Sequence, residues 1–105
     1  MALSVIASML VDGAAGTSFG FTSTAILLPG TTVGTDNYVR VANLGPCHIT
    51  IKLGTTSAVV VTQSTGITIM AGTVEYLTLS GATYIAGVAA GGPGNTSVVS
   101  LATGT

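Results

Sequence analysis

The feature that most constrains this chain is its scarcity of charge. Of its 105 residues two are basic and three are acidic, whereas 48% are hydrophobic. A soluble domain usually has about 25% charged residues, and a surface with far fewer has little to oppose self-association. We therefore expect copies of the chain or another protein to cover much of its surface, as in a structural building block. The five charged residues are Asp12, Asp36, Arg40, Lys52 and Glu75.

Length and composition predict a single all-β domain over residues 1–105. A chain of this length is typical of one domain. Its 15 glycines and its many Val, Ile and Thr residues favour short strands joined by turns, because β-branched side chains suit a pleated surface. The predicted fold is an antiparallel β-sandwich, with a jelly roll as one form of it, that carries an extended N-terminal segment.

Residues 38–105 have the regular pattern of a strand core. In 38–43 and again in 47–53, apolar side chains alternate with polar ones, which predicts two half-buried strands. The turn residues at 43–46 predict that these strands form a hairpin. The unbroken apolar run at 58–62 predicts a strand that is covered on both faces. Further strands are predicted at 67–70, 73–79, 83–88 and 96–102.

Residues 1–37 are less regular and are predicted to be an N-terminal arm or a swapped strand region. The apolar segment 4–11 favours a strand over a short helix, and Asp12-Gly13 is typical of a turn. A flexible link at 13–16 would let the preceding segment add a strand to a neighbouring subunit. Residues 16–28 are predicted to be extended.

The sequence contains no clear constellation of catalytic or metal-binding residues. Cys47 and His48 are adjacent, but consecutive side chains of a strand point to opposite faces, so they do not form a nucleophile and base pair. One His and one Cys are too few ligands for a metal site within one subunit, although three copies of His48 on a symmetry axis remain an alternative. We expect no enzyme activity and no cofactor, and we interpret the lone Cys47 as a small buried apolar group.

Composition also argues against nucleic-acid, membrane and secretory functions. Two basic residues are too few to neutralise a phosphate backbone. No run approaches the roughly 18 apolar residues of a membrane-spanning helix, and the first residues lack the basic region of a secretory signal. We therefore expect synthesis in the cytosol and neither a nucleic-acid nor a membrane partner.

Four short phrases of the strand core resemble a known family when they are taken in order. They are VANLG at 41–45, IKLGTTSA at 51–58, MAGTVE at 70–75 and GATYIA at 81–86. Together they resemble the small all-β decoration or head-fibre-type proteins of tailed bacteriophages. The resemblance implies a trimeric virion protein, made in the host cytoplasm, that binds the major capsid protein on the outside of the head and reinforces the shell against internal DNA pressure.

The candidate interface residues are the rare charged or titratable groups on the predicted strands: Arg40, His48, Lys52 and Glu75. An equally simple interpretation is that they only solvate an outer face. Two alternative functions also remain open. One is another part of a phage particle, such as a tail component or a major subunit. The other is a carbohydrate-binding module for host attachment, with Tyr38, Tyr76 and Tyr84 as its platform.

Overall fold

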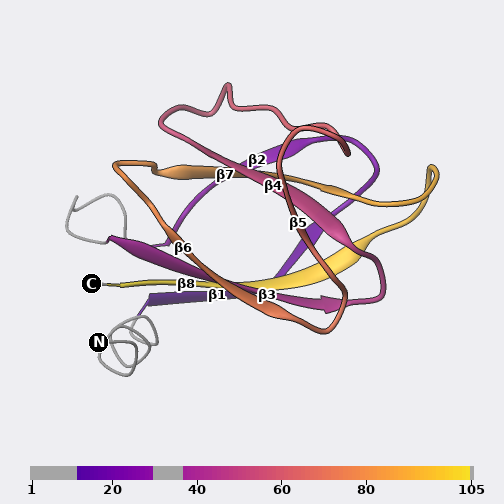
Figure 1. Ribbon diagram of the computed structural model, residues 1–105, viewed down its shortest axis with the longest axis horizontal. Coiled ribbons are helices and arrows are strands. Elements are labelled where there is room, and N and C mark those ends of the chain that lie inside the picture. The colour runs from indigo at the N-terminus through magenta and orange to yellow at the C-terminus, as the bar shows by residue number, and fades with distance from the viewer. Residues whose placement is uncertain (1–11, 30–36, 105) are drawn as a thin grey trace.

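The computed structural model describes residues 12–29 and 37–104, with the side chains of 12–16 left aside. Within these ranges the regular structure is a sandwich of two four-stranded antiparallel sheets, which Figure 1 shows as two layers. Sheet A has the order β1 (Asp12–Phe19), β8 (Ser97–Gly104), β3 (Tyr38–Gly45), β6 (Val74–Thr78). Sheet B has the order β2 (Thr24–Leu27), β7 (Tyr84–Ala89), β4 (Ile49–Gly54), β5 (Ile67–Ile69). The predicted all-β sandwich is confirmed.

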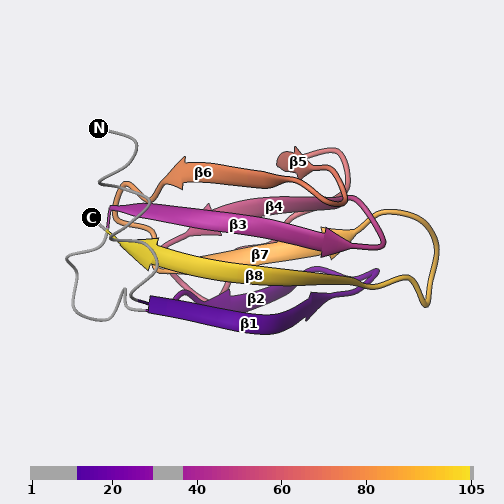
Figure 2. The same cartoon turned by 90° about the horizontal axis from the view of Figure 1, so that it is seen from below.

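The strands pair in a nested order, first with last. Strand β1 pairs with β8, β2 with β7, β3 with β6, and β4 with β5. Two further pairings, β3 with β8 and β4 with β7, complete the sheets. Figure 2 looks onto sheet A, with β1 and β6 as its edges. The chain is therefore doubled back on itself, and most strand pairs join residues that are far apart in the sequence.

The core follows from the alternation of side chains along the strands. In β3, Val39 and Val41 are fully buried, and in β4, Ile49 and Ile51 are fully buried. Because alternate residues of a strand face opposite sides of its sheet, both strands direct one apolar row into the space between the sheets. The main cluster contains Phe19, Leu28, Val39, Val41, Ile49, Ile51, Ile69, Leu79, Ala82, Ile85, Val99 and Leu101.

The predicted hairpin of 38–43 with 47–53 is wrong. Strand β3 belongs to sheet A and β4 to sheet B, so the turn between them is an arch that crosses from one layer to the other. The two apolar rows face each other across the core instead of lying side by side. Alternation alone does not distinguish these arrangements, because both bury the same residues.

The predicted strand at 58–62 is also wrong. These residues belong to the irregular connection 55–66 between β4 and β5. Val61 is buried and packs with Ala86 and Val88 of β7 in a second, smaller cluster, whereas Val60 is 68% exposed. The apolar run covers the outer side of sheet B without adding a strand to it.

The N-terminal region differs in part from the prediction. Asp12-Gly13, predicted as a turn, and 13–16, predicted as a flexible link, lie within β1 and run alongside β8. The register shifts between Ala14 and Thr17, as at a β-bulge, where one extra residue is accommodated in an edge strand. The predicted strand at 4–11, and the swap that depends on it, lie outside the described residues.

A buried amide fixes the arch between β3 and β4. The Nδ2 of Asn43 donates to the backbone oxygens of Cys47 at 2.8 Å and Ile69 at 2.9 Å. Its Oδ1 accepts from the backbone N–H of Gly45 at 3.0 Å and lies 2.7 Å from the hydroxyl oxygen of Ser97. Asn43 and Ser97 are both buried. One side chain thus joins β3 and β8 of sheet A to β5 of sheet B.

Replacement of this amide should destabilise the whole domain. We expect Asn43→Ala to lower the free energy of unfolding by about 2–4 kcal/mol, because several buried polar groups lose their partner at once. Asn95→Ala, at an exposed turn, is the matched control, with an expected loss below about 1 kcal/mol. Urea denaturation measures both, and equal losses would contradict the role assigned to Asn43.

Close packing of an aromatic ring on a glycine joins the two sheets at a second place. Phe19 of β1 is fully buried, and a Cβ built at Gly87 of β7 would overlap its ring. The absence of a side chain at Gly87 therefore lets the ring approach the backbone of the opposite sheet.

The substitution Gly87→Ala should force the ring of Phe19 to move. Overpacking of this kind costs about 1–3 kcal/mol. Gly92→Ala is the control, since nothing lies within 4 Å of a Cβ at Gly92. We expect thermal unfolding to give a clearly lower midpoint temperature for Gly87→Ala than for Gly92→Ala. Equal midpoints would show that the core accommodates the extra methyl group without strain.

Candidate functional site

The four predicted interface residues do not come together. Arg40 lies in β3 at a position that alternates with Val39 and Val41, so it faces the outside of sheet A. Lys52 is exposed in β4 and alternates with the buried Ile51, so it faces the outside of sheet B. The two basic residues therefore lie on opposite faces of the sandwich.

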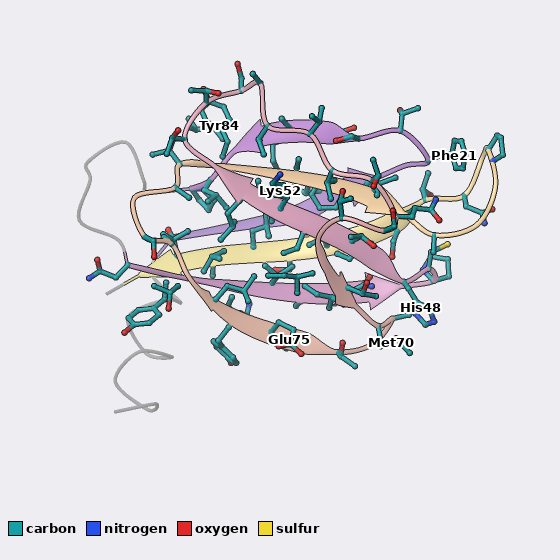
Figure 3. The ribbon with its side chains drawn as sticks, turned by 45° about the horizontal axis from the view of Figure 1, so that its top comes forward. Phe21, His48, Lys52, Met70, Glu75 and Tyr84 are labelled. Carbon is teal, nitrogen blue, oxygen red and sulfur yellow. The ribbon has the colours of Figure 1, made fainter. Side chains whose placement is uncertain are left out.

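Glu75 and His48 lie elsewhere again, as Figure 3 shows. Glu75 is exposed in the edge strand β6 and stands opposite Val41, on the inward side of sheet A. Arg40 stands opposite Tyr76, so Glu75 and Arg40 point to different sides of one sheet. An inward-pointing charge on an edge strand is a recognised way of discouraging strand addition.

His48 and Cys47 have structural contacts in the arch. Strand β4 begins at Ile49, so neither residue is in a strand. The Nδ1 of His48 accepts a hydrogen bond from the backbone N–H of Ala71 at 3.1 Å. Cys47 is half-buried, and its backbone oxygen accepts from Asn43. The ring of His48 thus fastens the turn after β5 to the arch.

Residues 12–29 and 37–104 contain no group of three or more His, Cys, Asp or Glu side chains that could hold a metal ion. In the same part of the chain, no helix is long and apolar enough to span a membrane.

The outer face of sheet A carries a group of exposed apolar side chains that the sequence analysis did not identify. We call Leu44, Val74, Tyr76 and Val98 the sheet A patch; their exposed fractions are 63%, 43%, 45% and 37%. They come from the three neighbouring strands β3, β6 and β8. Along each strand they alternate with residues on the core side of the sheet, but alternation alone does not show which side faces the core.

The register places these side chains in one continuous area. Val74 stands opposite Ala42, which is two residues from Leu44 on the same face of β3. Val98 stands opposite Gly45, next to Leu44, on the other side of β3. Tyr76 follows Val74 along β6 at the same alternation. The patch thus runs across the sheet from β8 to β6.

Arg40 borders the sheet A patch, and its Nε has no hydrogen-bond partner among the described residues. It stands opposite Tyr76 of β6 and Ala102 of β8. Its side chain is half-buried, and its Nε is buried without a hydrogen bond. An unpaired buried donor costs about 1–3 kcal/mol, and more for a charged group. This cost is removed if an acceptor reaches the guanidinium when the face is covered.

The outer face of sheet B is different, because the chain itself covers part of its apolar surface. Val59 and Val61 of the connection 55–66 pack over Ala86 and Val88 of β7. The connection turns hydroxyl groups outward, and Thr62 Oγ1 lies 2.7 Å from Thr65 Oγ1 and 3.3 Å from Ser64 Oγ. These hydroxyls are exposed, and so are Leu27 of β2 and Val60, at 48% and 68%. This face therefore presents hydroxyl groups together with two exposed apolar side chains.

The three tyrosines do not form a common platform. Tyr38 and Tyr76 lie on the outer face of sheet A, next to Arg40 along and across the strands. Tyr84 belongs to β7 of sheet B, and Figure 3 shows it away from the other sheet.

No protein-family model matches the chain, and the search of curated proteins finds no match.

Proposed function

We propose that the chain is a viral structural protein, a capsid decoration protein that binds the outside of a bacteriophage head and stabilises it. The observation that carries the proposal is the sheet A patch, an exposed apolar area on a molecule with five charged residues in all. Exposed apolar patches on small proteins are typical of surfaces that another protein covers. The proposal accounts for the patch and for the low charge together.

The nested strand pairing supports this proposal. First-to-last pairing over two four-stranded sheets is the order expected of a jelly roll, an architecture that recurs in viral capsid and lectin domains. We therefore favour the jelly-roll form of the sandwich. Because one fold serves many functions, the argument rests on the surface and takes only support from the fold.

The mechanism of such a protein is binding without chemical change. A homo-oligomer, for which we propose a trimer, places several copies of one weak contact on the symmetric shell. Contacts that are linked in this way bind far more tightly than each does alone. The bound oligomer then bridges neighbouring copies of the major capsid protein, and unfolding or rupture of the shell must break these contacts as well.

A carbohydrate-binding module is the second candidate. Tyr38 and Tyr76 flank Arg40 on the outer face of sheet A, and aromatic rings beside a polar group suit the apolar face and hydroxyls of a sugar. Two rings are fewer than the predicted platform of three. Binding to glycans that is lost when Tyr38 or Tyr76 is replaced, measured without shells, would favour a carbohydrate-binding module over a capsid decoration protein.

Binding to emptied shells tests the proposed function. The probe is a DNA-free head assembled from the major capsid protein encoded in the same genome as this chain. We expect the wild-type chain to be a discrete oligomer by light scattering, to saturate the shells at a fixed ratio and to raise their rupture temperature by several degrees. A monomer that leaves both the sedimentation and the rupture temperature of the shells unchanged would contradict the proposal.

A further inference from the structure

We propose that the outer face of sheet A is the surface that meets the shell, and that its partner is an apolar protein surface carrying a carboxylate opposite Arg40. This inference rests on the proposed function, because it names the surface and the chemistry of that same contact. The outer face of sheet B then faces the solvent.

The apolar part of the contact is supplied by the sheet A patch. Leu44, Val74, Tyr76 and Val98 are between 37% and 63% exposed, and they lie on three adjacent strands of a single sheet. A sheet face of this kind suits a broad, flat partner. Its aromatic residue, Tyr76, is of the type that most often anchors protein interfaces.

Arg40 supplies the specific part of the contact. It borders Tyr76, and the described residues give it neither an ion pair nor a hydrogen bond for its buried Nε. A planar guanidinium matches a carboxylate with two parallel hydrogen bonds. When the surrounding patch is covered, water leaves, and the attraction between the two charges becomes stronger.

Charge complementarity argues against a second copy of the chain as the occupant of this face. Two copies placed face to face would bring two Arg40 side chains to the contact. Glu75, the one acidic side chain that the structure describes, lies on the other side of the sheet. A partner that brings its own carboxylate satisfies the guanidinium without this conflict.

The other surfaces are less suited to the shell. On sheet B the apolar residues Ala86 and Val88 are already covered by the connection 55–66, whose outward hydroxyls bond to one another. Leu27 and Val60 are the large apolar residues left exposed on that side, against the four of the sheet A patch. At the β6 edge, the inward-pointing Glu75 discourages pairing with another strand. Face binding through sheet A is therefore favoured over strand addition at β6.

Matched substitutions on the two faces test the inference. The double variant Leu44→Ser/Tyr76→Ser and the single variant Arg40→Gln change the sheet A face. Val60→Ser, at a side chain that is 68% exposed, and Lys52→Gln change the sheet B side. We expect each sheet A variant to bind emptied heads at least tenfold more weakly than the wild type, and both sheet B variants to bind within twofold of it.

The remaining outcomes separate the two proposals. Wild-type binding with no loss in the sheet A variants, or with a loss only in Val60→Ser and Lys52→Gln, overturns the inference and leaves the proposed function intact. Failure of the wild type to bind overturns both. If the sheet A variants lose self-association in sedimentation but keep shell affinity, a second copy occupies the face and the inference is wrong. Each variant is folded if its urea midpoint lies within about 0.5 M of the wild-type midpoint.

Discussion

The arrangement of this sandwich depends on the buried amide of Asn43. An apolar core gives little information about which strand lies beside which, because any pairing that buries the same rows gains similar free energy. A buried amide is more demanding, since each unpaired donor or acceptor costs about 1–3 kcal/mol. The arch oxygen of Cys47, the β5 oxygen of Ile69 and the hydroxyl of Ser97 meet around Asn43, which favours one assignment of strands to sheets.

The same arrangement decides which apolar side chains remain outside the core. With β3 between β8 and β6 in sheet A, their outward positions form one face, and no described connection is seen to pack over the sheet A patch as 55–66 packs over sheet B. Among the described residues, the sheet A patch is therefore exposed, whereas part of the outer face of sheet B is covered. Because of this difference, we propose that the outer face of sheet A, and not that of sheet B, binds the shell.

Local patterns in the sequence predicted much of the fold, and pairing between distant residues explains the rest. The strands at 67–69, 74–78 and 84–89 follow alternation and turn residues and lie where they were predicted. The hairpin failed because Asn43 interacts with Ser97, 54 positions away in the sequence, and no local pattern reports such a contact. The strand predicted around Val61 is wrong because an apolar run does not distinguish a strand from a covering loop, since both bury apolar side chains.

The candidate site was predicted less well than the fold. Rare charges directed attention to Arg40, His48, Lys52 and Glu75, yet sheet assignment scatters them over two faces, an arch and an edge. Only Arg40 borders the exposed apolar area. The patch itself becomes visible once each strand has been assigned an inner and an outer side, which requires the pairing that the sequence did not reveal.

The central claim concerns the orientation of the molecule on a shell, and a cryo-electron microscopy reconstruction of decorated, emptied heads tests it most directly. The account predicts that sheet A faces the shell, with Arg40 against a carboxylate of the capsid protein. Density that places sheet B and the connection 55–66 against the shell would contradict it.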